Sequence, residues 1–268
     1  MNHFNLVAVV YGLVVLALLI AKTVAPEFSY PAWLDDLALL RMSAVAKILF
    51  LGLGALFANQ VASSFDAENP ACPAWRLLGI GLTGFFLGQG YLAFYQIALG
   101  LTSPYPSLAD IAFMAGYPFL LAAFWRFIRA YRESGLPVGS PREHGILALV
   151  AAAVFVAIGF VALGPVVAAA SPPVEKALNI AYPTFDLLIL IPLVILLRIT
   201  VPFRGGHIWT VWAALLAGFV SMGAADILYA YFVTLGQAWL ESLIDVLFVL
   251  SYVLVSQATL KQRALLTS

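Results

Sequence analysis

The stretch NLVAVVYGLVVLALLIAKTV (residues 5–24) contains a single charged side chain, that of Lys22. A helix needs about 20 mostly apolar residues to cross the hydrocarbon core of a bilayer, because it rises about 1.5 Å per residue. No Lys or Arg precedes Asn5 and no small-residue cleavage pattern follows Ile20. We therefore expect a retained transmembrane helix here and not a signal peptide.

Further apolar stretches of similar length continue along the chain. They lie at 40–62, 76–100, 107–128, 145–165, 175–198, 208–233 and 241–260. The whole chain of 268 residues is 63% hydrophobic and 10% charged, with a mean hydropathy of +1.01. So few charges cannot coat a soluble fold of this size. The sequence predicts an all-α, polytopic integral membrane bundle of about eight transmembrane helices.

The charged residues and the cysteine content exclude several classes of protein. The formal net charge is zero, which gives no basic field for a nucleic acid, so no nucleic-acid partner is expected. A lone Cys72 excludes a disulfide framework and a cysteine metal site. His3, His144 and His207 lack metal-binding spacing, so we expect neither a metal nor another cofactor.

The basic residues divide unequally between the two faces of the predicted bundle. One face has Arg76, Arg126, Arg129, Arg132, Arg142, Arg198, Arg204, Lys261 and Arg263, whereas the other has Lys22, Arg41 and Lys176. Loops rich in Lys and Arg stay in the cytoplasm. We therefore expect a multi-pass protein of the cell (inner) membrane with both termini in the cytoplasm, surrounded by membrane lipids.

The chain repeats part of itself at an offset of 135 residues. Ser107-Leu108-Ala109-Asp110 matches Ser242-Leu243-Ile244-Asp245, Tyr117 matches Tyr252, and Gly88 matches Gly223. Four spans in each half give the halves the same orientation, as in a parallel repeat. We predict two similar four-helix halves, 1–134 and 135–268, in one membrane domain. In the first half, Gly84 and Gly88 form a GxxxG pattern that favours close helix packing.

Ionisable side chains inside the predicted spans are candidates for function, because placing a charge in the bilayer is costly. Lys47, Asp186 and Asp226 lie in the spans at 40–62, 175–198 and 208–233. An ion pair of Lys47 with Asp226 or Asp186 would reduce that cost. A structural network and a ligand-binding or catalytic pocket both account for this polarity. The predicted outward-facing pocket contains Lys47, Gln89, Tyr91, Tyr182, Asp186, Asp226 and Tyr229.

Two other aspartates are expected to cap helices. Asp110 follows Ser107 by three residues and Asp245 follows Ser242 by three residues. A Ser-x-x-Asp sequence is a variant of the capping box, in which both side chains bind free N–H groups of the first turn. The sequence predicts such caps at the starts of the fourth and eighth spans.

Four short motifs carry a resemblance to a known family. They are Gly88-Gln89, Pro104-Tyr105-Pro106-Ser107-Leu108-Ala109-Asp110 with Gly116-Tyr117-Pro118, Tyr182-Pro183-Thr184-Phe185-Asp186, and Ala225-Asp226-Ile227-Leu228-Tyr229. In this order the chain resembles the multi-span N-terminal regions of bacterial diguanylate cyclase/phosphodiesterase receptors, with Gln89 in place of an acidic residue.

The resemblance implies a membrane sensor that binds a small molecule or lipid, or detects a membrane state, and signals to a cytoplasmic effector or through a homo-oligomer. No GGDEF or EAL motif occurs in the 268 residues, so no cyclase or phosphodiesterase activity is expected.

Two other classes of function remain open. A weaker likeness to intramembrane lysoplasmalogenases makes Asp186 and Asp226 the general acid and base of a lipid hydrolase. A small transporter is also compatible with a parallel repeat and with an aspartate deep in the membrane.

Overall fold

The computed structural model describes residues 3–25, 30–31, 33–66, 68–136, 138–235 and 241–267, and every regular element within these ranges is a helix. The α-helices are α1 (His3–Val24), α2 (Asp36–Ser63), α3 (Cys72–Ala93), α4 (Leu108–Glu133), α5 (Pro141–Ala162), α6 (Gly164–Ala168), α7 (Pro173–Thr200), α8 (His207–Leu235) and α9 (Glu241–Thr267). A π-helix, η1 (Phe94–Leu99), continues α3, and a 3₁₀ helix, η2 (Val201–Phe203), follows α7.

Seven of the helical segments are long and apolar enough to cross a membrane. They correspond to α1, α2, α3 with η1, α4, α7 with η2, α8 and α9. The protein is therefore an all-helical, multi-pass membrane protein. The remaining predicted span, 145–165, falls mainly on α5, whose side chains are described only in part, so the count of eight stays a prediction.

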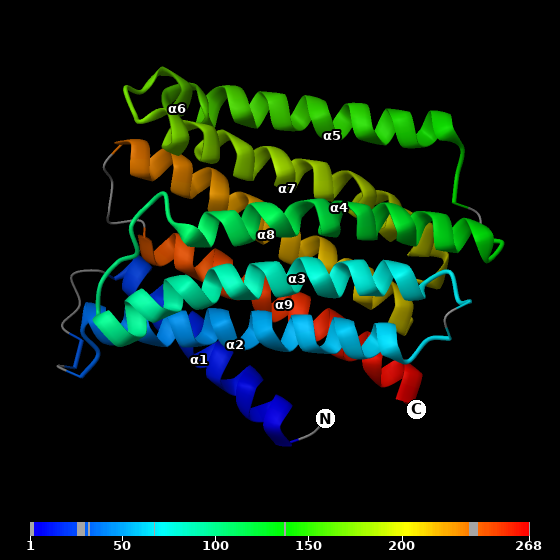
Figure 1. Ribbon diagram of the computed structural model, residues 1–268, viewed down its shortest axis with the longest axis horizontal. Helices are drawn as coiled ribbons and strands as arrows, with labels where there is room; N and C mark the ends of the chain where they lie inside the picture. Colours follow the sequence, from blue (N-terminus) through cyan, green and yellow to red (C-terminus); the bar gives the residue numbers. More distant parts are fainter. Residues whose placement is uncertain are drawn as a thin grey trace.

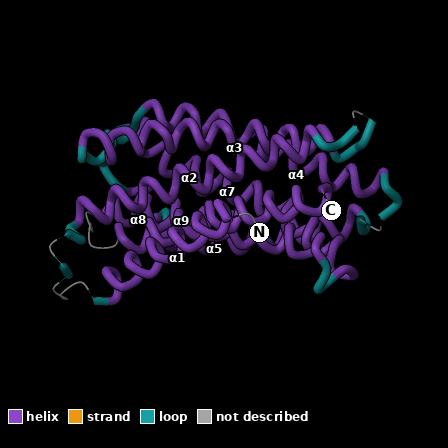
Figure 2. The backbone as a smooth tube through the Cα atoms, turned by 90° about the horizontal axis from the view of Figure 1, so that it is seen from below, coloured by secondary structure: helices purple, strands orange, loops and turns teal. Residues whose placement is uncertain are grey.

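Six helices form a closed ring. Around it α2 contacts α3, α3 contacts α4, α4 contacts α7, α7 contacts α8, α8 contacts α9, and α9 returns to α2. Figures 1 and 2 show these helices running roughly side by side along the long axis of the molecule. Outside the ring, α1 packs on α2 and α9, and α5 packs mainly on α7 at the opposite edge (Figure 1).

Glycines allow α3 and α4 to approach closely. A Cβ atom added to Gly84 would lie 3.2 Å from the carbonyl oxygen of Ala112, and one added to Gly88 would lie 3.0 Å from that of Ala109. Across the contact, a Cβ atom on Gly116 would lie 2.9 Å from the carbonyl oxygen of Gly81. The close packing predicted for the GxxxG pattern is confirmed, and it places Gln89 next to the start of α4.

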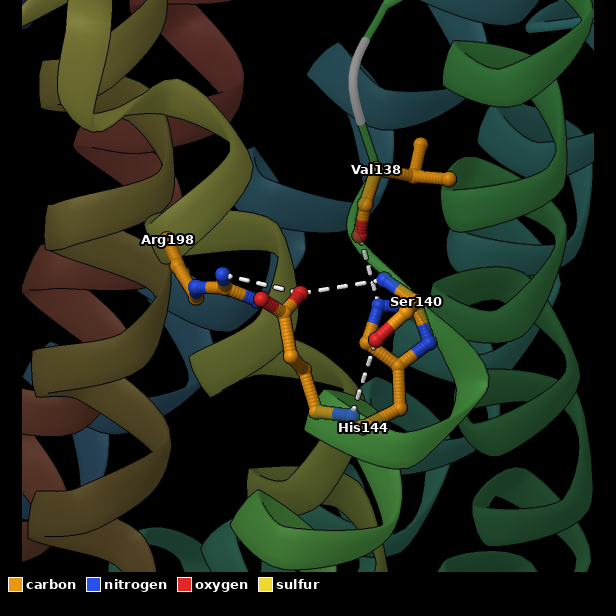
Figure 3. Close-up of polar contacts among 5 residues, drawn as sticks. Val138, Ser140, His144 and Arg198 are labelled. Carbon is orange, nitrogen blue, oxygen red and sulfur yellow. Dashed lines mark hydrogen bonds and ion pairs between the residues drawn. The ribbon is translucent and has the colours of Figure 1, made fainter.

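Helix α5 is joined to α7 by polar contacts at its N-terminus (Figure 3). Ser140 and Glu143 form reciprocal bonds: the Ser140 N–H donates to the Glu143 carboxylate at 3.0 Å, and the Glu143 N–H donates to the Ser140 hydroxyl at 3.3 Å. The same carboxylate pairs with Arg198 of α7 at 3.0 Å. A ring nitrogen of His144 lies 2.6 Å from the carbonyl oxygen of Val138. These contacts fix the entry of the chain into α5.

Candidate ligand-binding cavity

A cavity of about 550 Å³ lies inside the six-helix ring. Every ring helix contributes to its wall, as do η1 and the loop at residues 100–107. Lipophilic and aromatic side chains make up most of the lining, including Phe85, Phe113 and Phe248. Each ring helix also contributes at least one polar or charged side chain to the lining. This combination, at this size, is typical of small-molecule sites.

Lys47 of α2 enters the cavity and pairs with Asp245 of α9. Its Nζ lies 2.8 Å from Oδ1 of Asp245, and the Ser43 hydroxyl donates to Oδ2 of the same carboxylate at 2.6 Å. The Lys47 side chain is 7% exposed and that of Asp245 is 22% exposed. The predicted pairing of Lys47 with Asp226 or Asp186 is wrong, because α9 and not α7 or α8 packs against α2.

The predicted capping role of Asp245 is also wrong. Helix α9 begins at Glu241, so Asp245 lies beyond its first turn, where the backbone N–H groups already have partners within the helix. Its carboxylate binds Lys47 and Ser43 across the helix interface instead. The side chain of Ser242, the partner in that prediction, lies outside the described residues.

Asp110 caps α4 and also faces the cavity. The Ser107 N–H donates to its Oδ2 at 2.6 Å, and the Ser107 hydroxyl accepts from the Ala109 N–H at 3.2 Å, so the predicted capping box is confirmed. The other oxygen, Oδ1, accepts a hydrogen bond of 2.6 Å from the Tyr182 hydroxyl. Hydrogen bonds satisfy this carboxylate, but no cation pairs with it among the described residues.

Asp186 and Asp226 form a second acidic group deeper in the ring. The Tyr117 hydroxyl donates to Oδ1 of Asp186 at 2.8 Å. Asp226 lies within hydrogen-bonding reach of both Asp186 and Tyr117. Among the described residues Oδ2 of Asp186 is buried and has no hydrogen-bond donor. Asp226 lines the cavity, whereas Asp186 lies behind Tyr117.

Among the described residues, three amide side chains around the cavity each have a buried polar atom without a hydrogen-bond partner. They are Nε2 of Gln89, Nδ2 of Asn179 and Oε1 of Gln96. Gln89 and Asn179 are each 2% exposed, and Asn179 uses its other polar atom to accept from the Tyr105 hydroxyl at 2.6 Å. Buried polar groups usually have a partner. These amides are therefore available to a molecule in the cavity.

Burial and neighbouring groups both raise the pKa of the loop residue Tyr105. Its pKa lies well above the ordinary value of 10.0, first because the phenol is buried. The neighbouring Tyr229, Asp110, Asp226 and Glu175 raise it further, because they disfavour a second negative charge. Tyr105 also packs edge-to-face on Tyr229, with ring centroids 5.6 Å apart. Negative charge and aromatic rings thus occupy the same part of the cavity.

Most of the predicted pocket residues come together. Lys47, Gln89, Tyr182, Asp226 and Tyr229 line the cavity, and Asp186 is one contact behind it. The exception is Tyr91, which does not line the cavity; its hydroxyl lies 3.4 Å from that of Tyr95.

The sequence interpretation missed several cavity contacts. Ser43 was not identified, although it precedes Lys47 by four residues and so shares its helix face. Tyr105 and Tyr117 were noted only as motif residues, yet each donates a hydrogen bond to a buried polar side chain. A tyrosine spaced by whole helical turns from an intramembrane acid is the signal that could have identified Tyr117.

Within the described residues, no three His, Cys, Asp or Glu side chains come together in a way that could hold a metal ion. No protein-family model, curated protein or solved structure matches this chain.

Proposed function

We propose that this membrane protein is a receptor module that binds a small molecule or lipid in the cavity and passes the signal to a cytoplasmic partner. The observation that carries the proposal is the cavity itself, which all six ring helices build and which contains buried amides without partners. A purely structural polar network would be expected to satisfy its own amides. An occupant in contact with all six helices could favour one arrangement of the ring over another.

The charge distribution supports an orientation for this receptor. The loops and helix ends that carry most of the arginines lie away from the 100–107 loop, which forms part of the cavity wall. By the positive-inside rule these arginines face the cytoplasm. In the proposed orientation the protein lies in the cell membrane with both termini in the cytoplasm, and the cavity opens on the other side.

The predicted duplication supports a signalling mechanism. Adding the offset of 135 residues to Lys47 gives Tyr182, and adding it to Asp110 gives Asp245. The contacts Lys47–Asp245 and Tyr182–Asp110 are thus equivalent under the offset, and both connect the two predicted halves. A ligand held between the halves would change their relative packing, and the cytoplasmic ends of the helices would move with them.

Native mass spectrometry of the gently purified protein tests this proposal. We expect a retained molecule at up to one per chain in the unaltered protein, and its loss in Asp226→Asn. The matched control is Asp66→Asn, which removes the same charge from an exposed loop residue outside the cavity. A retained molecule that survives Asp226→Asn, or cavity variants that leave the bound mass unchanged, would argue against the cavity as the binding site.

The acidic pair favours a second candidate, an intramembrane lipid hydrolase. Asp226 reaches the cavity and Asp186 lies within hydrogen-bonding reach of it, so one could supply and the other accept a proton. Incubation with lysolipids whose chain is attached through a vinyl ether, in detergent micelles, tests this candidate, because water adds across that bond to release the chain as a fatty aldehyde and to leave the glycerophospho head group. Released head group or fatty aldehyde, lost in both Asp226→Asn and Asp186→Asn, would support a hydrolase over a receptor. Equal turnover in the variants would exclude these carboxyls as its acid and base.

A further inference from the structure

The charges on the cavity wall are unbalanced in a way that identifies a ligand class. Three carboxylates line the cavity, those of Asp110, Asp226 and Asp245. Lys47 is the cation among the described lining residues, and Asp245 already neutralises it. Arg41, at the same end of the molecule, is exposed and does not line the cavity. Asp110 and Asp226 therefore face the cavity without a positive partner there.

The two contacts that are equivalent under the 135-residue offset show where the positive charge is missing. Lys47 pairs its positive charge with Asp245. Its counterpart at the 135-residue offset is Tyr182, which donates only a neutral hydroxyl to Asp110. Hydrogen bonds satisfy the oxygen atoms of Asp110 without neutralising its charge. An ionised carboxylate shielded from water is stabilised most by an opposite charge. Lys47 thus supplies a positive charge on one side of the ring, whereas Tyr182, at the equivalent position on the other side, supplies none.

Aromatic rings surround the same region. Tyr105 packs on Tyr229, and Tyr182 packs on Phe113 and Tyr117 with centroid distances of 6.4 and 6.1 Å. Several of these rings line the cavity beside Asp110 and Asp226. The faces of aromatic rings attract cations, and cages of aromatic rings are a recurring way to bind quaternary ammonium groups. Anions would meet repulsion from both features.

The unsatisfied amides provide an independent indication of a polar occupant. Gln89 and Asn179 are almost fully buried, line the cavity and keep one polar atom without a partner. Amide groups can bind a hydroxyl, ether or ester oxygen of a ligand. The whole cavity of about 550 Å³ is lined mostly by apolar and aromatic side chains, so beside a polar head group it suits an apolar body of several carbon atoms.

We propose that the cavity binds an organic cation: an amine or quaternary ammonium head group lies between Asp110 and Asp226 against the tyrosines, and an apolar body fills the rest. This inference rests on the proposed receptor function and specifies its ligand class. The same chemistry is found in free amines and in cationic lipid head groups.

Three probes with one apolar body test the proposal on the full chain in lipid nanodiscs. They are 4-phenylbutylammonium, 4-phenylbutanol and 4-phenylbutanoate, at an ionic strength fixed with sodium chloride so that inorganic cations form the baseline. We expect the ammonium probe to bind at least about tenfold more tightly than the alcohol, and the carboxylate to bind more weakly than both. Isothermal titration calorimetry gives the three values of Kd.

Charge-removing variants locate the binding site. Asp110→Asn and Asp226→Asn should each weaken the ammonium probe at least about tenfold and change the alcohol little, whereas Asp66→Asn should change neither. The comparison among probes uses the unaltered protein, so it remains decisive if a variant does not fold.

The outcomes separate the two proposals. If the alcohol binds as tightly as the ammonium probe, or the carboxylate binds best, the cation class is wrong while a binding cavity stands. If no probe binds and the purified protein retains no molecule, both the cation class and the receptor function fail. A choline-containing lipid that displaces the ammonium probe from nanodiscs would identify a lipid source; displacement by free amines alone would identify a soluble one.

Discussion

Lys47 and Asp245 form an ion pair of 2.8 Å that connects α2 to α9 across 198 positions of the chain. The pair has a neutral counterpart in the hydrogen bond from Tyr182 to Asp110, which connects α7 to α4. Each contact links two neighbours in the six-helix ring. Together they fasten the ring at two places around the cavity, one by opposite charges and one by a hydrogen bond.

Removing one member of the ion pair should be more damaging than removing both. Lys47→Met leaves Asp245 without its cation, and breaking a buried pair in this way costs about 3–5 kcal/mol of unfolding free energy. Because the Asp245 side chain is 22% exposed, we expect the lower part of that range. The double variant Lys47→Met with Asp245→Leu should recover most of the loss, because no buried charge remains. Thermal and denaturant unfolding in micelles measures both effects.

The control for these variants is the pair Lys22–Asp36, which has a similar distance of 2.9 Å but in which Asp36 is 87% exposed. Lys22→Met should cost less than about 1 kcal/mol, because water screens exposed pairs. Equal losses at Lys22 and Lys47 would contradict the interpretation of Lys47 as a buried charge that depends on its partner.

The hydroxyl of Tyr117 should matter more than that of Tyr252. Tyr117 donates to Asp186 at 2.8 Å within a fully buried environment, so Tyr117→Phe leaves a carboxyl oxygen without its donor, at a cost of about 1–3 kcal/mol. Tyr252 occupies the position 135 residues later and also lines the cavity, but its hydroxyl donates to no carboxylate of the described residues. Tyr252→Phe is therefore the matched control, with an expected loss near zero. A larger loss at Tyr252 would refute the special role assigned to Tyr117.

Hydropathy made the helices predictable, because a bilayer requires long apolar segments whatever their partners. The span predicted at 40–62 nevertheless falls short of α2, which begins at Asp36 with a cap from Asp35. Polar residues of the first turn are satisfied at the membrane surface and leave no apolar signal. The span predicted at 76–100 does cover η1, but hydropathy cannot distinguish its π-helical hydrogen bonds from those of an α-helix.

The partners of the buried charges could not be predicted from the sequence. Lys47 and Asp226 both lie in predicted spans, but a position within a span does not specify which helices are neighbours. That choice follows from the closed ring, in which α9 returns to α2. The Ser107–Asp110 capping box was predictable because three residues of helix fix its distance, but the same spacing failed at Asp245, which lies beyond the first turn of α9. Contacts over 198 residues have no such local determinant.

The close approach of α3 and α4 predicts a strong effect for one added methyl group. In Gly116→Ala the new Cβ would lie 2.9 Å from the carbonyl oxygen of Gly81 and 2.7 Å from the Phe85 ring, so the helices must separate. We expect a loss of about 1–3 kcal/mol, as for other overpacked sites, and a reduced ligand affinity because Phe85 lines the cavity. Gly145→Ala in α5 is the control.

At Gly145 an added Cβ meets nothing within 4 Å, so only the intrinsic helix preference for alanine should act, with a stabilisation of up to about 1 kcal/mol. Opposite signs at the two glycines, measured by thermal unfolding in micelles, are the expected result. A stabilising Gly116→Ala would show that α3 and α4 are not in tight contact.

The contact between Glu143 and Arg198 should make the attachment of α5 sensitive to acid. The backbone N–H of Ser140 and then the Arg198 guanidinium hold the pKa of Glu143 below its ordinary value of 4.5. A carboxyl group with a lowered folded-state pKa stabilises the fold fully above pH 4.5, and that contribution disappears as the pH falls through the folded-state pKa. The unaltered protein should therefore exceed Glu143→Gln in unfolding midpoint at pH 7, and the difference should vanish in the acid range below pH 4.5.

The exposed Glu68, in the loop between α2 and α3, serves as the control, and Glu68→Gln should leave the midpoint unchanged at pH 7. A difference between Glu143→Gln and the unaltered protein that persists unchanged to pH 3 would mean that packing, and not the charge of Glu143, is responsible. Arg198→Met separates the two partners of the carboxylate: it removes the ion pair but keeps the Ser140 N–H bond. Because that backbone bond is the largest single cause of the lowered pKa, part of the acid sensitivity should survive in Arg198→Met.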